Sequence, residues 1–182
     1  MNMQTRDQSG YEDRDKDKRF GYCKFDIDPF SVDLTGSMKI AVYRKATPDV
    51  PDTVMACDED WYVKVEWDLQ GRLLHHLCGY FCVCVYLERI GPGPDLKLDC
   101  DGDGRPCIEW IPIDPCGDGH YEVKCDRPKD GIECEACGTL YLVAVTLTSF
   151  DQCKDPGHIR AYCKGPTLMF YPPHNKEEQP AP

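Results

Sequence analysis

A period-two alternation of apolar and polar residues recurs along the middle of this chain. It is clearest at residues 61–67, 81–87 and 141–147, where every second side chain is Trp, Phe, Tyr, Val or Leu. Successive side chains of a β-strand point to opposite faces of the sheet, so this pattern predicts half-buried strands. Weaker versions occur at residues 38–43, 108–113, 120–125, 158–163 and 167–171. A sustained period of 3.6 residues is missing, so we expect no helix beyond a short segment near residues 69–77.

Turn-forming residues separate these stretches. They are Gly71, residues 91–94, Gly102, Gly104, Gly117, Gly119, residues 130–131 and residues 156–157. About seven short antiparallel strands with turns at this spacing are typical of a sandwich and fit a barrel less well. The sequence therefore predicts an all-β fold, a single antiparallel β-sandwich.

Residues 138–141, Gly-Thr-Leu-Tyr, lead directly into one of the alternating stretches. This segment resembles the late strand of immunoglobulin-like and fibronectin type III-like sandwiches, in which a Tyr near the strand start anchors a corner. The resemblance implies an immunoglobulin-like fold over residues 33–171. The antibody-type order Cys, Trp, Cys is not recognisable, because Cys57 precedes Trp61 and Trp67 too closely. We therefore expect no inter-sheet disulfide of that type.

The length and composition fit one domain with two tails. The chain has 182 residues, 41% of them hydrophobic, which is enough for a single core. Residues 1–32 begin with mixed acidic and basic residues and are predicted to be a charged, flexible arm. Residues 33–171 are predicted to be the sandwich domain. Residues 172–182 are rich in Pro and Glu and are predicted to be an extended, disordered tail.

The charge and hydropathy limit the choice of partner. A net charge of −11 opposes the counterion release that drives nucleic-acid binding. Apolar runs stay far shorter than the roughly 20 residues that span a bilayer. We therefore expect a protein partner or self-association, with no nucleic acid and no membrane insertion.

Thirteen cysteines indicate either a disulfide framework in an oxidising compartment or thiolate metal ligands in a reducing one. Residues 1–28 hold no apolar segment of the secretory kind. That absence favours cytoplasmic synthesis without a signal peptide, and leaderless release to the extracellular space is the alternative. An odd total leaves at least one cysteine outside any intramolecular disulfide.

An Asp-rich motif, D-x-D-x-D-G, begins at Asp99 and includes Asp101 and Asp103. Alternate carboxylates can converge on one calcium ion, and the glycine permits a sharp turn. The twelfth position is Trp110 where an EF-hand has a bidentate Glu, so an EF-hand is not expected. The alternatives are a calcium loop of another type and a solvated turn between strands.

Cys134 and Cys137 form a single C-x-x-C motif, the spacing at which two thiolates bind one zinc ion. A second C-x-x-C is missing, so the other ligands would come from elsewhere in the chain. The candidates are Cys100, Cys107, Cys116, His120 and Cys125. A disulfide or unligated thiols are the alternatives to zinc.

Cys82 and Cys84 lie two apart in one predicted strand and therefore share a face with Tyr80 and Tyr86. These cysteines can pair with neighbouring strands or another subunit, or remain small buried thiols. The two tyrosines and Tyr62 are predicted on the side opposite the core. If all three lie on one sheet, they form an apolar interface.

Catalytic motifs are missing from the sequence: it holds no Gly-x-Ser-x-Gly elbow and no phosphate-binding loop. Neither catalytic residues nor a bound cofactor are therefore predicted. The leading hypothesis is a non-enzymatic structural or protein-interaction β-sandwich module, a subunit of an assembly that associates through sheet edges or the tyrosine-bearing face. The alternative is a metal-binding β protein that uses the Asp-rich calcium loop or the Cys-based zinc site.

Overall fold

The computed structural model describes residues 17–27, 33–102, 105, 107–128 and 131–173. These residues form two β-sheets, as the sequence predicts. The five-stranded sheet has the order β1-β3-β6-β10, with β4 paired to β3. Its strands are β1 (Phe20–Lys24), β3 (Thr35–Arg44), β4 (Thr47–Pro51), β6 (Trp61–Gln70) and β10 (His120–Asp126).

The seven-stranded sheet has the order β2-β12-β11-β7-β8, with β5 paired to β12 and β9 paired to β7. Its strands are β2 (Asp26–Ile27), β5 (Val54–Ala56), β7 (Tyr80–Arg89), β8 (Leu96–Lys97), β9 (Cys107–Pro112), β11 (Thr139–Phe150) and β12 (Pro156–Tyr171). The β5–β12 pair is parallel and the other strand pairs are antiparallel. One short 3₁₀ helix, Leu74–His76, falls in the region where the sequence allows a helix.

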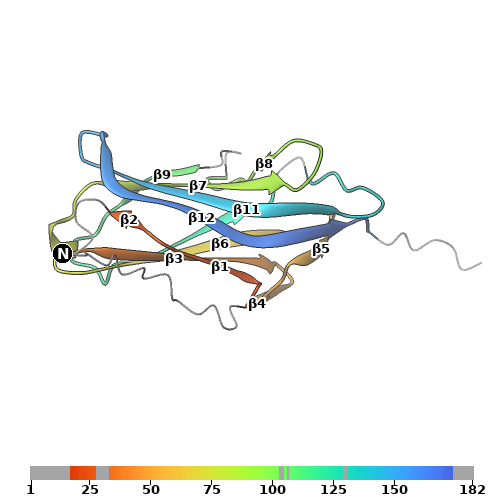
Figure 1. Ribbon diagram of the computed structural model, residues 1–182, viewed down its shortest axis with the longest axis horizontal. Coiled ribbons are helices and arrows are strands. Elements are labelled where there is room, and N and C mark those ends of the chain that lie inside the picture. The colour runs from red at the N-terminus through yellow and green to blue at the C-terminus, as the bar shows by residue number, and fades with distance from the viewer. Residues whose placement is uncertain (1–16, 28–32, 103–104, 106, 129–130, 174–182) are drawn as a thin grey trace, which may run out of the picture.

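The two sheets face each other across one hydrophobic core, and Figure 1 shows β7, β11 and β12 as a layer above β3 and β6. The inward positions of the predicted strands supply this core. Trp61 of β6 lies 5.4 Å from the ring of Phe170 in β12, and Trp67 lies 5.8 Å from Phe81 in β7. The arrangement is consistent with a β-sandwich, because side chains from the two inner faces pack together.

The predicted N-terminal arm is wrong over residues 20–27. β1 pairs with β3, and β2 pairs with β12, so the folded part begins before residue 33. Both strands are short and follow a strongly charged segment, and their pairing depends on distant residues that local composition does not reveal. Residues 1–16, 28–32 and 174–182 lie outside the described residues.

A disulfide between Cys23 in β1 and Cys163 in β12 joins the two sheets. The two residues are 140 positions apart in sequence, and their Cα atoms lie 5.7 Å apart. Gly21 faces Gly165 next to this bond, and a Cβ on Gly21 would collide with the Gly165 backbone. The absence of side chains at these two positions therefore lets β1 and β12 approach each other closely.

Three further disulfides are Cys57–Cys134, Cys84–Cys107 and Cys100–Cys125. Cys100 follows β8 and Cys125 lies in β10, so this bond connects the two sheets a second time. The structure thus favours the disulfide framework among the alternatives for the cysteines, and such frameworks are typical of oxidising surroundings. The cysteines outside disulfides are Cys78, Cys82, Cys116, Cys137 and Cys153.

Candidate functional site

The predicted calcium loop follows β8. Asp99 is 8% exposed, and its backbone exchanges hydrogen bonds with that of Asp126. The Asp101 carboxylate accepts a hydrogen bond from the backbone N–H of Arg105 at 3.2 Å, and the Arg105 guanidinium lies 3.8 Å from it. Asp103 lies outside the described residues. The carboxylate of Asp101 therefore has a structural role in the turn, and calcium binding stays a prediction.

The predicted C-x-x-C pair is divided between two environments. Cys134 is bonded to Cys57, whereas Cys137 is exposed and its sulfur lies 3.9 Å from the Glu135 carboxylate. A sulfur in a disulfide is not a thiolate and does not bind zinc in the manner of a zinc knuckle. A zinc site on this pair would require the reduced protein, and zinc binding also stays a prediction.

The three tyrosines predicted to lie opposite the core belong to different sheets. Tyr80 and Tyr86 are in β7 of the seven-stranded sheet, as is the cysteine pair. Tyr62 is in β6 of the five-stranded sheet, where its ring stacks on Tyr43 at 5.6 Å. The condition for one interface formed by all three tyrosines is therefore not met, because strands with the same alternation can join either sheet.

The outer side of the seven-stranded sheet is nevertheless rich in apolar side chains, and we call it the apolar face. Its members are Val54, Tyr80, Tyr86, Ile90, Trp110, Leu140, Leu142, Ala144, Phe150, Tyr162 and Met169. The outward charged residues of β7, β11 and β12 are only Glu88, Arg160 and Lys164. An apolar face of this extent is the feature of the described residues that most resembles an interaction surface.

One end of the apolar face carries a row of exposed aliphatic side chains. Val54 pairs with Met169, Met169 pairs with Leu140, and the Ile90 backbone N–H donates to the Leu140 carbonyl. The four residues thus lie side by side across β5, β12, β11 and the residue that follows β7. Their exposed fractions are 44%, 38%, 42% and 51% in this order. Parity along 139–150 and, after the β-bulge in β12, along 167–171 marks Leu140 and Met169 as outward, a signal that the sequence prediction did not use.

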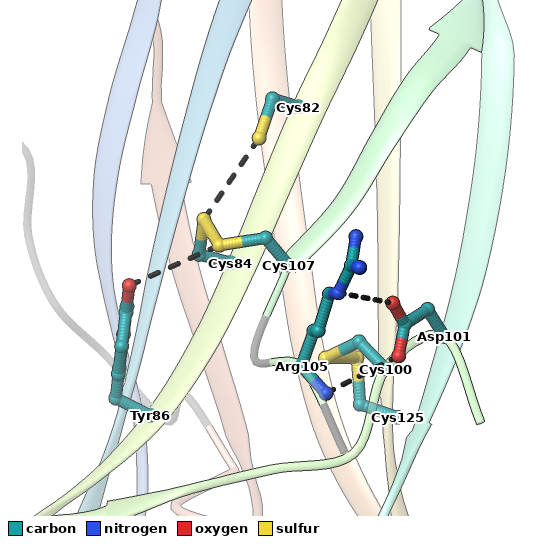
Figure 2. Close-up of a disulfide and its surroundings, with 8 residues drawn as sticks. All are labelled: Cys82, Cys84, Tyr86, Cys100, Asp101, Arg105, Cys107 and Cys125. Atoms are coloured by element: carbon teal, nitrogen blue, oxygen red, sulfur yellow. Dashed lines mark hydrogen bonds and ion pairs between the residues drawn. A yellow bond between two sulfur atoms is a disulfide. The ribbon is translucent and has the colours of Figure 1, made fainter. Parts of the chain in front are cut away.

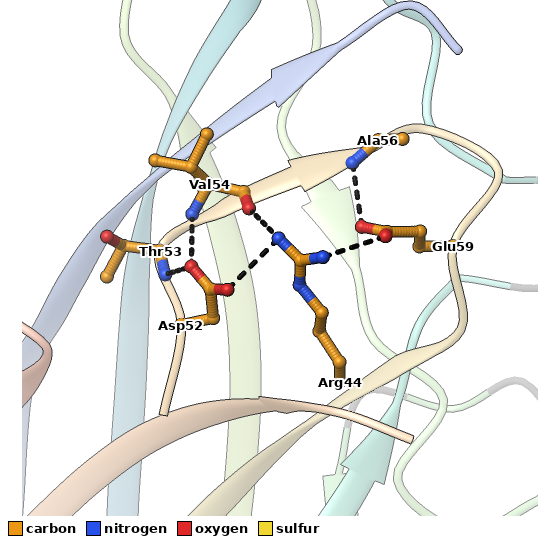
Figure 3. Close-up of polar contacts among 6 residues, drawn as sticks. All are labelled: Arg44, Asp52, Thr53, Val54, Ala56 and Glu59. Carbon is orange, nitrogen blue, oxygen red and sulfur yellow. Dashed lines mark hydrogen bonds and ion pairs between the residues drawn. The ribbon is translucent and has the colours of Figure 1, made fainter. Parts of the chain in front are cut away.

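Arg44 holds the segment that carries Val54 (Figure 3). Its guanidinium forms ion pairs with Asp52 at 3.0 Å and Glu59 at 2.9 Å, and donates to the Val54 carbonyl at 2.5 Å. The Glu59 carboxylate in turn accepts from the Ala56 backbone N–H at 2.9 Å. A planar guanidinium suits several carbonyl and carboxylate acceptors at once. Arg44 therefore fixes β5, and with it the first member of the aliphatic row.

The other end of the apolar face is an aromatic cluster. The Trp110 ring packs edge-on against Tyr80 at 5.7 Å and against Phe150 at 5.8 Å. The Lys154 ammonium lies 4.5 Å from the centre of the Trp110 ring. Trp110 and Lys154 have φ angles of 63° and 71°, in the left-handed region. Such a backbone is strained for a non-glycine residue and persists where surrounding contacts enforce it.

β7 places Cys82 and Cys84 between these two ends. With Cys107 they form a cluster of three sulfur atoms (Figure 2). The Cys82 sulfur is 3.9 Å from the Cys84 sulfur, which is bonded to Cys107 of β9. All three sulfurs lie within 4.8 Å of one another, and all three residues are half-buried. The Tyr86 hydroxyl lies 4.0 Å from the Cys107 sulfur. Of the alternatives for this strand's cysteines, Cys84 takes the disulfide with a neighbouring strand, and Cys82 is a half-buried cysteine outside the disulfides.

The outer side of the five-stranded sheet has a different chemistry, because ion pairs within and between its strands cover it. Lys64 lies 2.9 Å from both Glu66 and Glu122, Lys39 lies 3.8 Å from Glu66, and Lys124 lies 3.4 Å from Glu122. Hydrogen bonds from Lys64 hold the pKa of Glu122 below its usual range. The same bonds, to Glu122 and then Glu66, raise the pKa of Lys64.

A second group of potential metal ligands lies on this charged side. Glu66, His120 and Glu122 place one ligand atom each within 4.8 Å of the others. The His120 Nδ1 atom lies 2.8 Å from the Asp68 carboxylate, and this hydrogen bond raises the pKa of His120. Lys64 pairs with both glutamates, Lys39 pairs with Glu66, and Lys124 pairs with Glu122. The ion-pair network therefore explains why these three side chains lie close together.

An open pocket of about 290 Å³ lies beside the 3₁₀ helix. Leu34, Leu77, Ile113 and Phe150 are among its lining residues. This largely aliphatic and aromatic lining suits an apolar group better than a charged ligand. Among the described residues, no helix has the length and apolar character required to cross a membrane.

Comparisons with known proteins found no family model, no curated protein and no solved structure that matches this chain.

Proposed function

We propose that this chain is a non-enzymatic association module, an immunoglobulin-like sandwich that works as a subunit of an assembly. The observation that carries the proposal is the apolar face, and above all its row of four exposed aliphatic side chains. Water next to such a surface is unfavourable, and a partner that covers it gains about 25 cal/mol for each Å² of apolar area buried.

The size of the apolar face supports a stable interface. Neighbouring strands lie about 4.8 Å apart, and ten strand residues span about 33 Å. β12, β11 and β7 each cross the face with about ten residues, whereas β5 and β9 add three and six, so the face presents roughly 600 Å². This area is at the lower end of what each partner buries in specific protein interfaces.

The occupant that we propose is a second copy of this chain, related by a two-fold axis along β11. Such an axis lays β7 of one copy over β12 of the other, because these strands flank β11 on opposite sides. Leu140 then faces Leu140 of the partner copy, and the aliphatic row covers itself. Glu88 on β7 comes near Lys164 on β12 of the partner copy, so the few charges of the face are complementary.

Substitution of Leu140 by Lys tests this interface. Burial of a leucine side chain contributes about 1.5–3 kcal/mol, so Leu140→Lys should raise the dimer dissociation constant at least about tenfold. Val50→Lys is the matched control, because Val50 is 55% exposed but lies on β4 of the other sheet. Sedimentation velocity over a range of concentrations measures both variants. A wild-type protein that stays monomeric at several hundred micromolar would overturn the proposal.

The four disulfides support an oxidising place of action for this module. A framework of this kind constrains the unfolded chain and keeps the two sheets stacked while one of them binds a partner. Intact-mass analysis under non-reducing conditions, beside a reduced and alkylated sample, tests it. The expected result is a mass lowered by four pairs of hydrogens, and a fully reduced native protein would contradict it.

A further inference from the structure

The sulfur cluster on β7 and β9 places a thiol next to a disulfide. Within the described residues, it is the one place where three cysteine sulfurs lie within 4.8 Å of one another. Cys82 is outside the four disulfides, and its sulfur contacts that of Cys84 at 3.9 Å (Figure 2). Disulfides exchange when a thiolate attacks one of their sulfur atoms, and this reaction needs access at contact distance.

We propose that Cys82, Cys84 and Cys107 form a thiol–disulfide exchange site. The Cys82 thiol loses its proton, and its thiolate attacks the Cys107 sulfur. The Cys82–Cys107 bond forms as the Cys84–Cys107 bond breaks, and Cys84 leaves as a thiolate that takes up a proton. One disulfide and one thiol are present before and after the step, so no oxidant or reductant is consumed.

The local backbone suits movement of Cys107 between the two partners. Cys107 is the first residue of β9, so it can shift without breaking the strand. The ladder between β7 and β9 also has a bulge between the pairs Phe81–Ile111 and Val83–Ile108. Cys82 lies opposite this bulge, where β9 has one extra residue. A bulge bends its strand and disrupts the ladder locally, which gives the two strands room to adjust.

The chemical class that this site accepts is a small thiol. Its thiolate attacks the Cys107 sulfur, forms a mixed disulfide there and releases Cys84. Cys82 then attacks the same Cys107 sulfur and releases the small thiol unchanged. The small thiol is therefore a catalyst of the exchange, and the reactive thiol moves between Cys82 and Cys84 on the apolar face. The site needs only the geometry of one chain and does not depend on dimer formation.

The experiment locates the thiol in the wild-type protein at low concentration. Samples equilibrated at pH 8 with a small amount of glutathione are quenched with acid, alkylated with a maleimide, digested and sequenced by mass spectrometry. Fragmentation at Val83 separates Cys82 from Cys84. We expect the label at both residues, with at least about a tenth of the molecules labelled at Cys84. Without glutathione, the exchange should be faster at pH 8 than at pH 6, because the thiolate is the attacking form.

Two variants sharpen the result. Cys84→Ser should form a Cys82–Cys107 disulfide, and Cys82→Ser should contain only Cys84–Cys107. Cys153→Ser is the control, because Cys153 is exposed and outside the cluster, and it should leave the wild-type distribution unchanged. Label confined to Cys82 in the wild type at every pH, with glutathione present, would overturn the proposal whether or not Cys84→Ser folds.

Discussion

The outer sides of the two sheets present opposite chemistry on the same framework. Both arise from strands that alternate with period two, and both cover the same core. On the five-stranded sheet, Lys64 pairs with Glu66 in its own strand and with Glu122 in the next strand, and Lys39 pairs with Glu66 across strands. On the seven-stranded sheet, the outward positions hold mostly tyrosines, aliphatic side chains, threonines and sulfur, with few charges.

The side chains on the outer side of the five-stranded sheet interact favourably with water and with each other, whereas those on the outer side of the seven-stranded sheet expose apolar area to water. Cross-strand pairs of opposite charge remain solvated and stabilise a sheet by a fraction of a kilocalorie per mole each. Exposed apolar side chains gain nothing from solvent and are common at protein interfaces. In the proposed function, the seven-stranded sheet is therefore the associating side and the five-stranded sheet the solvent-facing side.

The largest expected effect comes from removing a covalent link between the two sheets. Replacing Cys23 and Cys163 by Ala removes the disulfide that joins β1 to β12. We expect the free energy of unfolding to fall by about 3–5 kcal/mol, because the bond closes a loop of 140 residues. Guanidinium denaturation measures the change.

The double variant Cys78→Ala with Cys153→Ala is the control for this prediction. Both residues are exposed and outside disulfides, so their replacement should change stability by less than about 0.5 kcal/mol. Equal stability of the two double variants would show that the Cys23–Cys163 bond does not hold the sheets together.

The sequence predicts the inward side chains well because the side-chain period of a strand is fixed by the backbone. Trp61, Trp67, Phe81 and Tyr141 are all buried, as their positions in the alternation require. Pairing between strands is not encoded in this local way. β1 was not predicted, because its pairing with β3 and its bond to Cys163 join residues far apart in sequence.

The candidate site shows the same limit. Cys82 and Cys84 were predicted to share a face, but Cys107 carries no local signal that it pairs with Cys84. The aliphatic row likewise depends on strand order, because Val54 reaches Met169 through the parallel pairing of β5 with β12. Side-chain parity indicates which residues face outward, and only the topology shows that they are neighbours.

Exchanging two charges on the apolar face tests whether the partner is a second copy of this chain. In the proposed dimer, Glu88 lies near Lys164 of the partner copy. Glu88→Lys should therefore raise the dimer dissociation constant about three- to tenfold, since a rim ion pair contributes roughly 1 kcal/mol and its reversal brings like charges together. Adding Lys164→Glu should restore the dissociation constant to within about twofold of wild type. Sedimentation equilibrium measures all three proteins.

Glu122→Lys on the other sheet is the control for the charge exchange, and it should leave dimer formation unchanged. The two-fold arrangement would be contradicted if Glu88→Lys weakened the dimer and the double variant did not restore the dissociation constant. Glu88 would then face a surface other than Lys164 of the partner copy.

The smallest expected effect tests the solvent-facing role of the five-stranded sheet. Lys64→Met removes the ammonium that Glu66 and Glu122 share and should lower stability by about 0.5–1 kcal/mol at pH 7. The pKa of Glu122 is lowered by Lys64 in the folded state, so this contribution is present above the ordinary pKa of 4.5. It is lost as the pH falls through the folded pKa, because the protonated carboxyl no longer interacts with the ammonium. Urea denaturation at pH 7 and at low pH measures the difference.

Lys124→Met is the matched control for Lys64→Met. The Lys124 side chain is 57% exposed and forms one longer ion pair, 3.4 Å from Glu122, whereas that of Lys64 is 22% exposed and forms two. We expect a smaller loss of stability from Lys124→Met, and an unchanged dimer dissociation constant for both variants. Equal losses that do not vary with pH would mean that Lys64 acts through packing of its aliphatic stem. A weakened dimer in either variant would mean that the charged side of the molecule also takes part in association.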